Sequence, residues 1–405
     1  MKRLLFVCAA ILAVLCGCDR TSHNGTKTPE SPTDTAAVTP AVTPEKGKDT
    51  AKDGDKSEKP LPPVPRSFWL GADISWETEM EQRGEKLYNF TGDEEWECTA
   101  LMKDLGLNAV RFRVWVDPHG GLCDKKDLLA KCIKAKREGL KIMVDFHYSD
   151  YWADPSAQSV PKAWKGHSYE QMKEDLKGHT VEVLTLLKEN GIEPNWVQIG
   201  NETTNGLLWS RKKGRGEMGS TVVEYEDTVG HIDFAPEQYA GFIQTGNDAV
   251  KSVFPSCKTI VHLDNGWDFS IYEKNLGILE KYGVSYDIVG MSLYPYWARD
   301  RGRNDADGVI TDCIANVSKV YRRFGKESMI VETGFEVDET RPALIEEGRR
   351  QLSEVISAAA LKTGGHCLGV FYWEPECRPS RYKLGAFGSD GRPTAIMLAF
   401  KEASR

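Results

Sequence analysis

Two glutamates follow apolar, β-branched runs and are the residues of this chain best suited to chemistry. Residues 195–206 read NWVQIGNETTNG, with Glu202 just after the apolar run, and residues 328–335 read SMIVETGF, with Glu332 in the same place. Each run is typical of a buried strand, and burying an unpartnered carboxylate costs several kcal/mol. Either glutamate alone is equally well explained as a solvated loop residue. The pair, 130 positions apart, indicates a two-carboxylate active site on a parallel barrel.

Two carboxylates without a metal-ligand cluster or a nucleophilic Ser or Cys motif suit glycoside hydrolysis. We predict that Glu202, beside the amide of Asn201, is the proton donor with a raised pKa, and that Glu332 is the ionised nucleophile. Arg111 and Tyr294 are the candidate partners of Glu332, and Asn201 is a candidate donor to the 2-hydroxyl of the sugar. The carboxyls are then expected about 5–5.5 Å apart, with retention of the anomeric configuration.

Eight strand-like runs alternate with helical segments and must position these residues. The predicted strands are 68–74, 109–116, 141–147, 196–202, 259–264, 288–294, 329–332 and 368–374, and the predicted helices are 94–105, 126–138, 169–190, 236–254, 271–282, 314–324 and 343–362. Apolar strands that alternate with helices form a parallel sheet. Eight units in about 340 residues predict an α/β fold, a TIM (β/α)8 barrel. A doubly wound sheet is the alternative, although residues 73–76 lack the Gly-rich turn of a dinucleotide fold.

Polar and aromatic residues gather at the carboxyl ends of the predicted strands, which form the catalytic face of a TIM barrel. The predicted substrate-binding residues are Asp73, Arg111, Trp115, His147, Trp152, Asn201, Asp264, Asn265, Tyr294, Trp297 and Trp373. Glu374 belongs to the same rim, and Tyr151, Trp164, Trp209 and Tyr296 add to its aromatic residues. Sugar rings stack their C–H faces on indole, so an aromatic groove fits a polysaccharide; core packing is the alternative for any one Trp. Trp373 is predicted to form the floor of the cleaved-sugar subsite.

These residues together resemble glycoside hydrolase family 53, the endo-β-1,4-galactanases of the retaining-glycosidase clan A. The resemblance runs from residues 71–77 (GADISWE) to residues 369–376 (GVFYWEPE). The stretches that match between them, in order, are LNAVRFRVWVDP, VDFHYSDYWADPSAQSVPKAW, VQIGNETTNGLLW, VHLDNG, SLYPYW and VETGF. Residues 150–155 and 161–164 are more specific for the family than the Asn-Glu pair, which the whole clan shares.

The resemblance implies a barrel in which Glu202 is the acid/base and Glu332 the nucleophile of a double displacement. It implies that the substrate is β-1,4-galactan, the side chain of pectin (type I arabinogalactan), and that Arg111, Tyr294 and Trp373 are supporting residues, as is Asn201. One alternative is a clan relative that acts on another β-1,4-glycan, such as mannan or cellulose. Another is a non-catalytic glycan-binding lipoprotein, which is expected to have lost one carboxylate.

The start of the chain has the pattern of an export signal. Lys2 and Arg3 precede an apolar run of about 14 residues, too short for a membrane span. Residues 15–18 (LCGC) resemble a lipoprotein cleavage box, with Cys18 as the lipidated residue and an ordinary signal cut as the alternative. We therefore expect a signal peptide over residues 1–17, a lipid anchor and disordered stalk over 18–65, and a catalytic barrel over 66–405. The expected location is the bacterial cell envelope, at the outer membrane, on its cell-surface or periplasmic side.

Charge and cysteine usage narrow the partners. The net charge of −8 argues against nucleic acid. We expect no cofactor, a monomer, and a polysaccharide substrate. Residues 304–308 (NDADG) have part of a calcium-loop composition without its full ligand pattern, and some family members bind structural calcium. Seven cysteines lie beyond residue 18, and no bridge among them is assigned: Cys98, Cys123, Cys132, Cys257, Cys313, Cys367 and Cys377.

Overall fold

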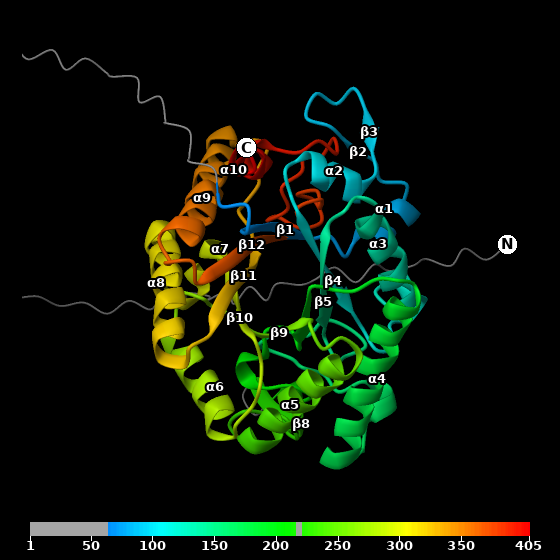
Figure 1. Ribbon diagram of the computed structural model, residues 1–405. Helices are drawn as coiled ribbons and strands as arrows, with labels where there is room; N and C mark the ends of the chain where they lie inside the picture. The colour runs from blue at the N-terminus through cyan, green and yellow to red at the C-terminus, as the bar shows by residue number, and fades with distance from the viewer. Residues whose placement is uncertain (1–63, 216–220) are drawn as a thin grey trace, which may run out of the picture. The chain divides into compact units, whose positions relative to one another are not determined.

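Eight parallel strands close into a barrel in this computed structural model, which describes residues 64–215 and 221–405 (Figure 1). The strands are β1 (Trp69–Asp73), β4 (Ala109–Val114), β5 (Lys141–Phe146), β6 (Trp196–Ile199), β9 (Lys258–Leu263), β10 (Ile288–Leu293), β11 (Glu327–Thr333) and β12 (Cys367–Trp373). Their order around the barrel is β1-β12-β11-β10-β9-β6-β5-β4. The predicted TIM barrel is confirmed, and each predicted strand end is correct to within three residues. The expected signal peptide, Cys18 anchor and nearly all of the stalk lie outside the described residues.

Helices follow the barrel strands and cover the barrel (Figure 1). The longer ones are α3 (Lys125–Arg137), α4 (Tyr169–Glu189), α5 (Pro236–Val253), α6 (Phe269–Lys281), α8 (Ala306–Phe324) and α9 (Pro342–Leu361). The shorter ones are α1 (Glu77–Gln82), α2 (Cys98–Asp104), α7 (Pro295–Ala298) and α10 (Leu398–Ala403). None of the helices in the described ranges is long and apolar enough to cross a membrane.

Two predicted helices begin at least four residues away from their expected starts. The helix predicted from residue 94 begins at Cys98, because residues 95–96 form strand β3 (Glu95–Trp96), which pairs with β2 (Leu87–Tyr88). The helix predicted from residue 314 begins at Ala306, where the carboxylate of Asp305 accepts a hydrogen bond from the backbone N–H of Gly308. This cap gives the acidic stretch 304–308 a structural use in starting α8.

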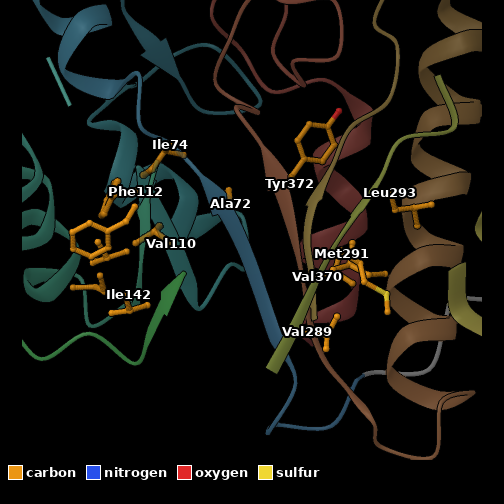
Figure 2. Close-up of a cluster of buried hydrophobic side chains, with 14 of the residues drawn as sticks. Ala72, Ile74, Val110, Phe112, Ile142, Val289, Met291, Leu293, Val370 and Tyr372 are labelled. Atoms are coloured by element: carbon orange, nitrogen blue, oxygen red, sulfur yellow. The ribbon is translucent and has the colours of Figure 1, made fainter. Parts of the chain in front are cut away.

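The barrel wall separates an outer apolar layer from a mixed interior. Along β4, Val110, Phe112 and Val114 pack into the outer layer, whereas Arg111 and Arg113 take the alternate, inward positions. Figure 2 shows side chains of this outer layer from several barrel strands.

The interior of the barrel changes from apolar to polar along the strands. Its apolar half is filled by Ala109, Met143, Trp196, Ile260, Ile288, Met329, Val331 and Phe371. Further along the same strands lie Arg111, Asp145, Gln198 and His262, all buried. The barrel therefore has a packed apolar base, and its charges are concentrated toward the carboxyl ends of the strands. The seven cysteines at 98–377 are free and buried.

Candidate active site

The backbone turns sharply between strand β6 and Glu202. Gly200 has a φ of +82°, and a Cβ at that position would lie 2.5 Å from a side-chain carbon of Thr203. Glu202 itself has a φ of 46°, in the left-handed region that non-glycine residues rarely adopt. Such strain persists only where the surroundings fix it, and it is concentrated at functional sites. The turn places the Glu202 carboxyl beside β10, where Ser292 Oγ donates a hydrogen bond of 2.6 Å to Oε1.

Glu332 lies near the end of β11 and has two strong partners. Arg111 Nη2 is 2.9 Å from Oε1, and the hydroxyl of Tyr294 donates a 3.0 Å hydrogen bond to Oε2. The Glu332 side chain is 7% exposed, so its charge depends on these partners rather than on water. The predicted roles of Arg111 and Tyr294 as partners of Glu332 agree with these contacts.

The two glutamates face each other across the mouth of the barrel. A carboxylate oxygen of each, together with a ring nitrogen of His262, lie within 4.8 Å of one another. Retaining glycosidases hold their carboxyls about 5–5.5 Å apart, whereas inverting enzymes need about 6.5–9.5 Å to admit a water molecule. The short separation of the nearest oxygens matches the retaining class.

The surroundings of the two glutamates favour opposite protonation states. Loss of water contact raises the pKa of Glu202 well above its ordinary value, the charges of Glu332 and Asp264 raise it further, and the Ser292 hydrogen bond lowers it. Burial raises the pKa of Glu332 to about 7, against the lowering effects of Arg111 and of the Tyr294 hydrogen bond. These surroundings favour the proton of the pair on Glu202 and the negative charge on Glu332, which has the cation of Arg111 beside it.

Arg111 is a buried hub beneath the pair, 1% exposed. In addition to Glu332 it contacts Asp73 Oδ2 at 2.8 Å, Asp145 Oδ2 at 2.8 Å, Asn201 Oδ1 at 2.8 Å and Gln198 Oε1 at 3.2 Å. Burial disfavours its charge, but these carboxylates raise the pKa of the guanidinium, which stays charged. Asp73 and Asn201, predicted to contact substrate, are thus held by this hub.

Asn201 and His147 are oriented by their own hydrogen bonds. Asn201 Nδ2 donates to the carbonyl of Ala153 at 2.8 Å, which accounts for one of its two N–H groups. His147 Nδ1 accepts from the indole N–H of Trp115 at 3.2 Å, and its Nε2 lies 3.0 Å from Asp145. His147 therefore connects the hub to the aromatic wall of the site.

Indole rings surround a second buried arginine, Arg113. Its guanidinium carbon lies 4.2 Å from the ring centre of Trp152, 5.3 Å from Trp115 and 5.7 Å from Trp76. Trp373 contacts this cluster, 5.7 Å from Trp152. The predicted residues Trp115, Trp152 and Trp373 are brought together as expected, whereas the structure adds Trp76.

Other predicted rim residues take several places. Asp264 accepts a 2.6 Å hydrogen bond from Thr204 and also one from Asn265, next to the loop that carries Glu202.

Trp297 is 39% exposed and Tyr151 is 61% exposed, so both present ring surface to solvent. Three other rim residues do not face solvent: Glu374 is fully buried and paired with Arg113, and Trp164 and Trp209 are 6% and 1% exposed. Core packing, the alternative stated for any Trp, applies to these last two.

Sequence reasoning missed Asp145, Gln198 and His262 as site residues. Gln198 Nε2 lies 2.8 Å from Asp145 Oδ1 and 2.8 Å from His262 Nδ1, and His262 Nε2 lies 2.8 Å from Ser292 Oγ. The signal that marks them is a polar residue at an inward position of an otherwise apolar strand, as Arg111 also shows.

Groups of potential metal ligands are few in the described ranges. Three sets have ligand atoms within 4.8 Å of one another: Glu202–His262–Glu332, Glu374–Glu376–Cys377 and Glu77–Glu81–Glu97. The first contains Glu202 and Glu332, the predicted acid and nucleophile.

A closed parallel barrel with two neighbouring glutamates at the ends of its fourth and seventh strands is the architecture of a two-carboxylate glycoside hydrolase. Residues 69–394 match the model of glycosyl hydrolase family 53. The chain belongs to this family.

Related proteins agree with this assignment. An uncharacterized protein in the bgaB 5′ region of Niallia circulans is 33% identical over 353 residues, covering 83% of this chain and 91% of that protein. The endo-beta-1,4-galactanase of Bacillus subtilis is 28% identical over 338 residues, covering 78% of this chain and 71% of that enzyme. The family 53 catalytic domain of Ignisphaera aggregans has a similar structure, with a TM-score of 0.71 and 28% identity, covering 85% of this chain and 99% of that domain.

Proposed function

We propose that this chain is an endo-acting β-1,4-galactanase that hydrolyses galactan side chains of pectin and releases galacto-oligosaccharides. The observation that carries the proposal is the Glu202–Glu332 pair, whose nearest carboxylate oxygens lie within 4.8 Å and whose surroundings differ in charge. The name of the Bacillus subtilis relative supports galactan as the substrate. The presence of both carboxylates argues against a non-catalytic glycan-binding protein.

The reaction takes place in two displacements. Glu332 attacks the anomeric carbon and forms a glycosyl ester while Glu202 gives its proton to the departing glycosidic oxygen. Glu202, now a carboxylate, then removes a proton from water, and the resulting hydroxyl displaces Glu332 with a second inversion. Arg111 and Tyr294 stabilise Glu332 as an anion before attack and again when it departs. Two inversions give net retention.

The first experiment compares product formation on unbranched β-1,4-galactan, mannan and cellulose, with early products followed by anomer-resolved NMR. We expect mixed galacto-oligosaccharides that appear first as the β-anomer. Cleavage of mannan or cellulose alone would keep the mechanism and reassign the specificity to the loops at 151–164 and 294–297. Binding without cleavage of any of the three glycans would contradict the catalytic assignment.

Export and lipid anchoring at the cell envelope form a separate part of the proposal. The support is the charged start, the short apolar run and the Cys18 box, with residues 19–65 as a tether. We expect the protein to fractionate with the outer membrane and to incorporate a labelled fatty acid. The Cys18→Ala variant should lose the label; retention of label by that variant would contradict Cys18 as the anchor.

Hydrolysis by a monomer without a cofactor completes the proposal. Its support is that the chain supplies both catalytic groups itself. We expect full activity after dialysis against a chelator and a single monomer-sized species in sedimentation velocity. Loss of activity that calcium restores would instead assign a structural ion.

A further inference from the structure

An aromatic cluster lies on the long loop between β6 and α5. It comprises Trp209, His231, Phe234 and Tyr225 of strand β8 (Thr221–Asp227), and we call it the aromatic platform. The ring centres of Tyr225 and Phe234 are 5.0 Å apart, and His231 lies 5.1 Å from Tyr225 and 4.8 Å from Phe234. Tyr225 is 42% exposed and Phe234 is 58% exposed, so adjacent ring surfaces face solvent.

The inner half of the platform is firmly built into the protein. Trp209 and His231 are 1% and 3% exposed, and their ring centres are 4.7 Å apart. The backbone N–H of Trp209 donates to the carbonyl of Gln158 at 2.9 Å. The buried Leu208 before it has a φ of 57°, a conformation that persists for a leucine only where the surroundings fix it. The two exposed rings thus stand on a fixed base.

Two hydrogen bonds through Gln158 connect the platform to the loop that carries Glu202. Gln158, which accepts from Trp209, donates through Nε2 to the carbonyl of Asn201 at 2.7 Å. Glu202 follows Asn201 and protonates the glycosidic oxygen of the departing sugar. The loop that carries the platform therefore begins next to Glu202, the group that faces the departing part of the polysaccharide.

The chemistry of the platform fits a neutral sugar chain. Aromatic faces bind the C–H faces of sugars, and hydroxyls need polar groups at the edge of the rings. Asp233 and Lys274 supply such an edge as a closed ion pair of 2.6 Å, adding no net charge next to Phe234. Arg211 lies 5.9 Å from the centre of the buried Trp209 ring.

We propose that the aromatic platform is an accessory binding site for a neutral β-1,4-linked glycan chain, on the loop that follows Glu202. That the glycan is galactan rests on the proposed function. An endo-acting enzyme works within long chains, so a strand bound in the cleft continues past Glu202. The platform holds that strand, or a neighbouring one, and raises affinity for polymer without contacting the bond that breaks.

The test compares polymer with short substrates in a Tyr225→Ala/Phe234→Ala double variant. Binding is measured by affinity electrophoresis and calorimetry in a Glu332→Ala background, so that the polymer is not consumed, and rates are measured in protein with both glutamates intact. We expect the double variant to bind long galactan about tenfold more weakly, because it loses two aromatic contacts. Its rate on a short galacto-oligosaccharide should not change.

A matched control is Tyr321→Ala. Tyr321 is an exposed aromatic residue at 38%, stacked on His366, which precedes β12 at the opposite end of the barrel. The control should bind polymer like the parent protein. Equal affinity of the double variant and its parent, or equal losses in the double variant and the control, would overturn the platform. If mannan or cellulose binds instead and the double variant loses that binding, the platform stands and galactan as the substrate does not.

Discussion

Glu202 and Glu332 are the same residue type at the same rim of the barrel, yet their surroundings differ. Glu332 has a buried cation, Arg111, on one oxygen and the Tyr294 hydroxyl on the other. Glu202 accepts from the neutral Ser292, and the negative charges of Glu332 and Asp264 act on it. The partners of each carboxyl, rather than its position at the rim, therefore favour the proton on one glutamate and the charge on the other.

Removal of the nucleophile has the largest expected effect on this comparison. Glu332→Ala should lower kcat on galactan by about 10⁴-fold or more, because no glycosyl ester can form. Binding of galactan, measured by calorimetry, should remain largely intact. Appreciable residual turnover by this variant would contradict the assignment of Glu332.

Removal of the acid should depend on the leaving group. Glu202→Ala should lower the rate of glycosidic cleavage in galactan by about 10²- to 10⁴-fold, because the departing oxygen then leaves without a proton. A galactoside with an activated phenol as leaving group needs no proton and should form the glycosyl ester at nearly the parental rate, seen as a burst of phenol. Equal losses of rate on both substrates would contradict the assignment of Glu202 as the acid.

Arg111→Met tests the hub under the charged member of the pair. It leaves Asp73, Asp145 and Glu332 without their shared cation, and removing one partner of a buried ion pair costs about 3–5 kcal/mol. The free energy of unfolding, measured by urea titration, should fall by that amount. Arg341→Met is the matched control, because Arg341 pairs with Glu336 and Asp338 with its side chain 57% exposed and should have little effect. Equal stability of the two variants would contradict the hub.

Tyr294→Phe and Ser292→Ala should have smaller effects. The first should narrow the pH range in which the enzyme is active, and the second should widen it. The hydrogen bond from Tyr294 lowers the pKa of Glu332, so its removal raises that pKa, which the parent protein sets at about 7. Activity requires ionised Glu332, and the acidic limb of the kcat/KM profile should move to higher pH and narrow the active range.

Ser292→Ala removes the hydrogen bond that lowers the pKa of Glu202, so that pKa should rise. Activity requires protonated Glu202, and the basic limb should move to higher pH and widen the active range. The kcat/KM profiles of both variants and of the parent protein, measured over the same pH range, test these two expectations. A shift of the same limb in both variants would show that the two carboxyls are not distinguished as described.

Much of the barrel was predictable because its signals are local. Apolar runs such as 141–146 end in polar residues, and Gly stops separate them from helices, so each strand was found from its own neighbourhood. Helix α8 was placed too late because its first turn is polar and only the Asp305 cap reveals it. Strand β3 was missed because two residues carry no periodic signal.

Short motifs in a strict order were enough to predict the family, the barrel and Glu202 and Glu332 as the candidate pair. The folded structure was needed to show that Arg111 contacts Asp73, Asp145 and Glu332 at once, and that Gln198 and His262 join the site. It also decided that Trp209 is buried whereas Tyr151 is exposed. The physical reason is that protonation and burial depend on neighbours contributed by different strands. Those neighbours are far apart in the chain and are brought together only when the barrel closes.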